Sequence, residues 1–119
     1  MSITVKAGVE FGVIRPAGYC ILGALRVTSR RLAVDLVITS GTDGTHSGPA
    51  DPHARGEAFD VRSKTLTAEQ REAVLASVMD QLGWSQFFGF LEDSGKPNEH
   101  LHFQRRKGHT YDFQKWLRA

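Results

Sequence analysis

Two short segments of the chain alternate strictly between apolar and polar side chains, and this pattern constrains the fold most strongly. Residues 57–62 place two apolar side chains on one face of a strand and Asp60 on the other. Residues 100–104 repeat the pattern, with His100 and His102 on the polar face. Two neighbouring antiparallel strands of this kind would bring a carboxylate and two imidazoles onto one surface, while their apolar faces pack into the core.

His53 and Glu99 are spaced to complete a metal site on that surface. His53 precedes Asp60 by seven residues, and Gly56 between them lets the chain turn so that the imidazole folds back over the strand. Imidazole nitrogens and a carboxylate oxygen suit Zn²⁺, and three protein ligands leave a fourth position open for water. A glutamate beside that water, such as Glu99, can act as its general base. We therefore interpret the chain as a zinc hydrolase.

The ordered combination of these motifs resembles a known family. The pattern His53-x-x-Gly56-x-Ala58-x-Asp60 followed by Glu99-x-x-His102 is similar to the signature of zinc D,D-peptidases. That family includes D-Ala-D-Ala carboxypeptidases, D-alanyl-D-alanine dipeptidases and phage L-Ala-D-Glu endolysins, and it shares its fold with the hedgehog signalling domain. The segment Ile38-Thr-Ser40-Gly41 also resembles the strand end that precedes the ligand loop in the family. The resemblance covers roughly residues 32–104.

The resemblance implies the roles of the site residues and the class of substrate. By this similarity His53, Asp60 and His102 bind zinc, and Glu99 activates the water. The substrate implied is a peptidoglycan stem peptide, cut either at the L-Ala–D-Glu bond or at the terminal D-Ala–D-Ala bond. The small size of the chain resembles that of a phage-type endolysin or a virion-associated cell-wall hydrolase.

The chain departs from the family after the strand end that precedes the ligand loop. Many relatives carry there an aromatic residue and an arginine that is credited with stabilising the oxyanion, whereas this chain has Thr42-Asp43. Relatives also often carry serine two residues before the first histidine, where this chain has Asp51. The electrophile must then come from other residues. The candidates for substrate binding or oxyanion stabilisation are Ser40, His46, Arg55, Arg62 and His100.

The position of the general base is open between two glutamates. Strict alternation places Glu99 on the face of the strand opposite to the one that carries His102. Its carboxylate therefore reaches the metal-bound water only if the chain bends as it enters the strand. Glu92 is the alternative base. His100 shares the face of His102 and could orient substrate.

Further patterns predict the other elements of an α+β fold. Pro16 begins a helix that ends near Arg31, and Thr67 opens a helix to about Leu82 through a Thr-x-x-Gln capping box. The β-branched run 32–39 and the aromatic-rich stretch 84–91 predict strands. The long polar stretch 41–52 predicts an active-site loop, and residues 110–118 a short closing helix. We expect a small antiparallel sheet that carries the zinc site and is flanked by two to three helices.

Length and composition bound the class of protein. The 119 residues predict a single domain over 1–119, which we expect to act as a monomer. A net charge of +2 is too small to indicate a nucleic-acid partner, and the single Cys20 excludes an internal disulfide. No apolar run approaches membrane-spanning length and no leader peptide opens the chain, so we expect a protein of the cytoplasm of the producing cell or of a virion.

A second function remains open on sequence grounds. The hedgehog domain keeps zinc while serving as a binding module, and the missing arginine after Gly41 permits the same here. In that case the chain would be a non-catalytic structural or adaptor component of a phage particle, held in shape by zinc.

Overall fold

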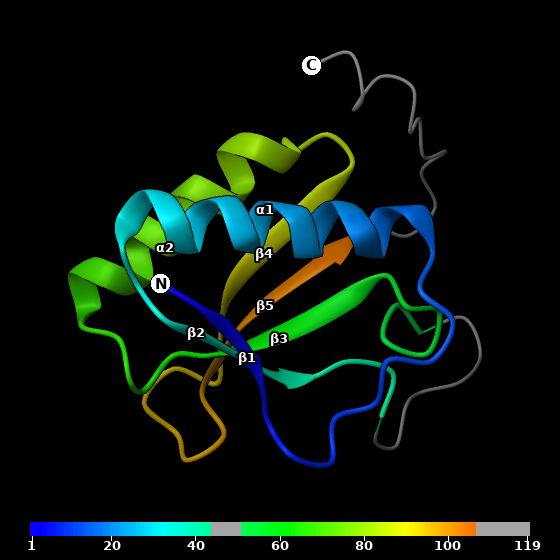
Figure 1. Ribbon diagram of the computed structural model, residues 1–119, viewed down its shortest axis with the longest axis horizontal. Helices are drawn as coiled ribbons and strands as arrows, with labels where there is room; N and C mark the ends of the chain where they lie inside the picture. The colour runs from blue at the N-terminus through cyan, green and yellow to red at the C-terminus, as the bar shows by residue number, and fades with distance from the viewer. Residues whose placement is uncertain (44–50, 107–119) are drawn as a thin grey trace.

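The computed structural model describes residues 1–43 and 51–106, which form an α+β fold of one five-stranded sheet and two helices (Figure 1). Both helices pack on the same face of the sheet, and within residues 1–43 and 51–106 no helix covers the other face, called the uncovered face below. In chain order the elements are β1 Ile3–Val5, α1 Pro16–Leu32, β2 Leu36–Ser40, β3 Ala58–Arg62, α2 Ala68–Leu82, β4 Phe87–Glu92 and β5 His100–Arg105.

The sheet has the strand order β1-β2-β3-β5-β4, and it is mixed rather than purely antiparallel. All neighbouring strands run antiparallel except β1 and β2, which are parallel. The α+β class is therefore confirmed, but the prediction of an antiparallel sheet was wrong at this edge. The reason is that α1 connects β1 to β2, and a helical crossover returns the chain in the same direction.

The predicted helices are confirmed, with small shifts at their ends. Pro16 is the first residue of α1, where its missing N–H needs no partner. Thr67 caps α2 as predicted. The backbone amide of Gln70 donates to the Thr67 hydroxyl at 3.1 Å, and the backbone amide of Thr67 donates to the Gln70 side-chain oxygen at 2.9 Å. The strand predicted to start at residue 32 begins at Leu36 instead, because α1 continues through Leu32 and the next residue adopts a left-handed conformation. The helix predicted over 110–118 lies outside the described residues.

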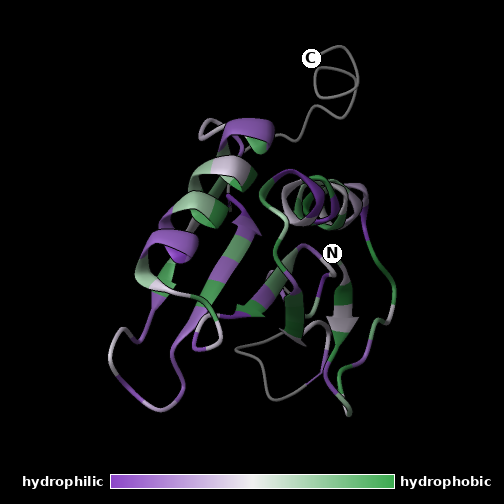
Figure 2. Cartoon of the chain, turned by 60° about the vertical axis from the view of Figure 1, so that its left-hand side comes forward, coloured by the Kyte–Doolittle hydropathy of each residue, from purple (hydrophilic) through white to green (hydrophobic). Residues whose placement is uncertain are grey.

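The apolar faces of β3 and β5 form the centre of the core, as the alternation predicted. Phe59, Val61, Leu101 and Phe103 are all at most 1% exposed and lie under the helices. The intervening residues of these strands point to the uncovered face, and the bands of opposite hydropathy along the strands are visible in Figure 2. This alternation places every polar residue predicted for the site on β3 or β5 on one surface.

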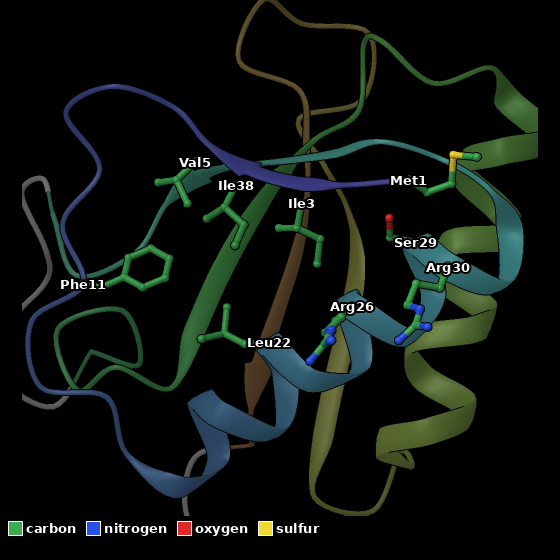
Figure 3. Close-up of a pocket in the computed structure, with 9 residues that line it drawn as sticks. All are labelled: Met1, Ile3, Val5, Phe11, Leu22, Arg26, Ser29, Arg30 and Ile38. Carbon is green, nitrogen blue, oxygen red and sulfur yellow. The ribbon is translucent and has the colours of Figure 1, made fainter.

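A hollow of about 600 Å³ lies on the helix side of the sheet, between β1 and α1 (Figure 3). Leu22, Ile3 and Ile38 point into it, and Arg26 lies at its rim. It shares no residue with the predicted site. In the described part of the chain, no helix combines the length and the apolarity that crossing a membrane requires.

The start of α1 packs directly on the loop that carries His53. An ideal Cβ at Gly18 would lie 2.0 Å from the carbonyl oxygen of Gly56, closer than any real contact. Gly56 itself has φ +67° and would bring a Cβ to 2.2 Å from the Val13 carbonyl oxygen. The helix and the loop can approach only because both positions lack a side chain.

We predict that Gly18→Ala destabilises the protein, whereas Gly23→Ala in the same helix stabilises it by about 0.5–1 kcal/mol. The reason for the difference is that nothing lies within 4 Å of a Cβ at Gly23, so the only change there is the gain in helix propensity. Thermal or urea unfolding of the two variants beside the wild type measures both effects. Equal stability of the two variants would contradict the packing described here.

Candidate metal centre

Four side chains from three adjacent strands converge on the uncovered face of the sheet. They are Asp60 of β3, Glu92 of β4, and His100 and His102 of β5, and one ligand atom from each lies within 4.8 Å of all the others. His53 joins this group from the loop before β3, with its Nε2 atom 3.4 Å from Asp60 Oδ1. This cluster of five residues, called the metal cluster below, could hold a metal ion.

The strand register explains why the strand residues of the cluster meet. Asp60 is the direct partner of His102 across β3 and β5, and Glu92 is the direct partner of His100 across β4 and β5. Directly opposed residues have their Cβ atoms about 5 Å apart on the same face of a sheet. The His102 Nδ1 atom therefore lies 2.8 Å from Asp60 Oδ1, and the His100 Nε2 atom lies 2.7 Å from Glu92 Oε1. The sequence predicted the first of these pairs and not the second.

A tight turn brings His53 over the sheet. The Asp51 carboxylate accepts the backbone amide of His53 at 2.9 Å, and the amides of Arg55 and Gly56 donate to the carbonyls of Asp51 and His53. The left-handed conformation of Gly56 then returns the chain to β3. The predicted role of this glycine as the turning point is confirmed.

Backbone carbonyls hold the outer ring nitrogens of two of the histidines. His53 Nδ1 lies 2.9 Å from the Gly41 carbonyl oxygen, and His100 Nδ1 lies 2.7 Å from the Asn98 carbonyl oxygen. A carbonyl oxygen only accepts, so each of these nitrogens must carry the proton and donate it. The Nε2 atoms of both rings face Asp60.

The third histidine is held in the same way by a side chain. His102 Nε2 lies 2.8 Å from Gln104 Oε1, while the Gln104 amide nitrogen donates to the Arg105 carbonyl at 3.0 Å. The second contact fixes the orientation of the amide group, so Oε1 accepts from His102 and Nδ1 faces Asp60. Such outer contacts select the tautomer that a metal ligand requires.

In each of the three histidines, the ring nitrogen that faces Asp60 is called the inner nitrogen below. Because the outer nitrogen carries a proton, each inner nitrogen presents either a lone pair or a second N–H group. They carry protons only if the rings are cationic, yet the His102 ring centroid lies 5.2 Å from that of His53 and 6.4 Å from that of His100. Three imidazolium groups at such distances repel one another. One divalent cation at the same place would satisfy the nitrogens and the carboxylates together.

The charges within the cluster shift the pKa values of its members. Burial alone would raise the pKa of Asp60, but its hydrogen bonds from His102 and His53 hold it well below the usual range. Burial lowers the pKa of His53 and His100, but nearby acceptors and carboxylates, chiefly Asp60 for His53, outweigh it and raise both values. Without a metal, these shifts favour a negative Asp60 together with positive His53 and His100.

The structure does not bring Glu99 to the metal cluster. One oxygen of its carboxylate accepts from Ser63 Oγ at 2.7 Å, and the other accepts from the Gly95 amide at 2.8 Å. Arg71 of α2 lies 3.7 Å away, on the helix side of the sheet. This placement does not support Glu99 as the general base, because the alternation of β5 directs it away from His102. Glu92, the alternative base, lies in the cluster.

The other predicted candidates fall into three groups. Ser40 and Arg62 neighbour the cluster, since their backbones pair with Asp60 and His100. The guanidinium of Arg55 is held by the buried Glu57 carboxylate at 2.7 Å. His46 lies outside the described residues.

Asp43, which follows the end of strand β2, has a structural role. Its carboxylate accepts the Gly41 amide at 2.8 Å and the Glu10 amide at 3.1 Å. Burial would raise the pKa of Asp43, but these backbone hydrogen bonds lower it. Asp43 thereby fixes Gly41, whose carbonyl in turn accepts from His53.

An open cleft of about 500 Å³ lies beside the cluster, and sequence reasoning missed part of its wall. Phe88 and Phe90 of β4 line it, whereas the sequence indicated only a strand in this aromatic-rich stretch. Of the three phenylalanines of β4, Phe87, Phe88 and Phe90, only Phe87 is fully buried. Alternation along β4 could have indicated this wall, because residues 88 and 90 lie on the same face as Glu92, which must face His100 to reach it. The full lining is Asp51, Pro52, His53, Phe88, Phe90, Glu92, His102 and Gln104.

Comparisons with known proteins add no assignment. No protein-family model matches the chain, and neither the curated proteins nor the solved structures contain a significant match.

We predict that pH acts in opposite directions on the metal-free and the metal-loaded protein. A histidine whose pKa is raised in the folded state stabilises that state below its unfolded pKa and loses this contribution as pH rises through the folded value. The chelated protein should therefore become less stable as pH rises between about 5.5 and 8, whereas stabilisation by added zinc should grow, since protons compete with the metal.

Thermal unfolding with chelator and with zinc across this pH range measures both trends. A chelated protein that gains stability over this range, or a zinc effect that does not change with pH, would contradict the arrangement of histidines around Asp60.

Proposed function

We propose that the chain is a zinc-dependent peptidase that hydrolyses an amide bond of a peptidoglycan stem peptide. The observation that carries the proposal is the orientation of the three histidines: each donates its outer N–H to an oxygen and turns its inner nitrogen toward Asp60. This donor set of imidazoles and carboxylates suits Zn²⁺. The resemblance of the sequence motifs supplies the substrate class.

His53 Nε2, Asp60 Oδ1 and His102 Nδ1 would hold the ion. They are the three predicted ligands, and the Asp60 atom lies 3.4 Å from the first nitrogen and 2.8 Å from the second. Three protein ligands leave a position open, which distinguishes catalytic from structural zinc sites. When bound, zinc would polarise the scissile carbonyl and lower the pKa of a water.

Glu92 is the general base in this proposal. Its carboxylate is 40% exposed, lines the cleft and lies 3.9 Å from His102 Nδ1. It can therefore take a proton from the attacking water and pass it to the leaving amine. His100, whose Nε2 lies 2.7 Å from Glu92 Oε1, orients that carboxylate.

Arg62 and Ser40 are the proposed electrophilic groups, in place of the arginine that relatives carry after the strand end. Arg62 is the register partner of His100, and Ser40 is that of Asp60. A guanidinium or a hydroxyl at this edge of the cluster can donate to an oxyanion.

The matched pair Glu92→Gln and Glu99→Gln tests the assignment of the base. We expect Glu92→Gln to lose at least a hundredfold in turnover of purified peptidoglycan while it still binds zinc, because the amide cannot accept the proton. Glu99→Gln should keep most of the turnover and lose some stability, since it weakens the contacts with Ser63 and Gly95. Metal analysis and mass spectrometry of the released peptides give the readouts. The reverse pattern would return the base to Glu99.

The short distances between the ligand atoms of four cluster residues favour a second function. The ligand atoms of Asp60, Glu92, His100 and His102 lie close enough to surround one ion, and four protein ligands would leave no position for water. The chain would then be a zinc-stabilised binding or structural module. In that case Glu92→Gln would weaken zinc binding itself, and neither wild type nor variants would cleave peptidoglycan.

A further inference from the structure

The cleft beside the metal cluster has an aromatic wall. The rings of Phe88 and Phe90 stack with centroids 5.9 Å apart and an angle of 26° between their planes. Their centroids lie 6.1 Å and 5.5 Å from that of the His102 ring. An apolar surface therefore begins directly next to the metal ligands.

Arg106 extends this wall with a positive charge. Its guanidinium carbon lies 5.5 Å from the centroid of the Phe88 ring, over the face of the ring. The Nε atom donates to the Trp84 carbonyl at 2.6 Å, and the backbone amide donates to the Gln86 carbonyl at 2.8 Å. Main-chain atoms thus fix the arginine at both ends, while its two terminal nitrogens keep the geometry that binds a carboxylate through two hydrogen bonds.

Two other arginines, Arg55 and the neighbouring Arg105, differ from Arg106 in their partners. Arg55 and Arg105 both pair with Glu57, which is only 5% exposed, at 2.7 Å and 3.3 Å. Among the residues that the structure describes, Arg106 forms an ion pair with no carboxylate. A fixed guanidinium without an anionic partner, one aromatic ring away from a metal cluster, is placed to take its anion from a ligand.

We propose that Arg106 and the aromatic wall form a subsite for a carboxylate of the substrate, with the carboxylate on the guanidinium and apolar atoms on Phe88 and Phe90. This inference rests on the proposed peptidase function and narrows its substrates to peptides with a free carboxylate near the cleaved bond. Two stem-peptide groups have that chemistry: the terminal carboxylate of D-Ala–D-Ala, and the free carboxylate of the D-Glu residue after L-Ala. The subsite makes Arg106 a determinant of specificity.

The test compares synthetic peptides that differ only in this charge. One pair ends in D-Ala–D-Ala as a free acid or as an amide, and the other contains L-Ala–D-Glu with the D-Glu carboxylate free or amidated. Zinc-loaded wild type, Arg106→Gln, Arg106→Lys and Arg31→Gln are assayed on all four. Arg31→Gln is the matched control, because it removes the same charge from the exposed end of α1. Zinc content and thermal unfolding confirm that each variant is folded.

We expect the wild type to favour the free acid of one pair, and that pair identifies the source of the carboxylate. Arg106→Gln should lower kcat/KM for that acid by about tenfold or more, mainly through KM, since a charge-assisted contact to substrate is lost. The rate of cleavage of the matching amide should not change. For the free acid, the kcat/KM of Arg106→Lys should lie between those of the wild type and Arg106→Gln, and the kcat/KM of Arg31→Gln should equal that of the wild type.

The possible failures are distinguishable. If Arg106→Gln loses the same factor on acid and amide, or the wild type cleaves acid and amide equally well, the subsite is overturned while the peptidase function stands. If the wild type cleaves none of the four peptides and no purified peptidoglycan, the proposed function fails and the subsite with it.

Discussion

The pairing of Asp60 with His102 across β3 and β5 is the contact on which the site depends. It joins the two central strands on their uncovered face, while Phe59, Val61, Leu101 and Phe103 bury the opposite face under the helices. A shift of one residue in this register would turn the cluster inward and the core residues outward. The burial of the apolar face therefore holds the polar cluster in place, and the geometry of the metal site follows from the packing of the core.

Three further residues then fix the histidines of the cluster through their outer ring nitrogens. Gly41 and Asn98 offer carbonyl oxygens to His53 and His100, and Gln104 offers its amide oxygen to His102. The Gly41 contact reaches further, because the Asp43 carboxylate ties this glycine to the N-terminal segment through the Glu10 amide. Asp43 thus supports the position of His53 in the cluster through Gly41.

The strands of the site could be predicted because alternation is a local signal. Phe59, Val61 and Asp60 show the orientation of β3 without knowledge of its neighbours, and the register with His102 then follows from the burial of one face. Two features could not be predicted in this way. The contact between Glu92 and His100 depends on which strand lies beyond β5, and the parallel pairing of β1 depends on a helical crossover. The positions of the Glu99 and Arg106 side chains depend on hydrogen-bond partners distant in sequence, the Ser63 hydroxyl and the Trp84 carbonyl, which no periodicity indicates.

The most direct test of the metal centre is NMR of the histidine ring nitrogens, recorded with chelator and with one equivalent of zinc. Zinc should bind to Nε2 of His53 and Nδ1 of His102, with the proton retained on Nδ1 of His53 and Nε2 of His102, because Gly41 and Gln104 accept those protons. Ring-nitrogen signals of His53 and His102 that zinc does not change, or a proton on the opposite nitrogen of either ring, would contradict the account.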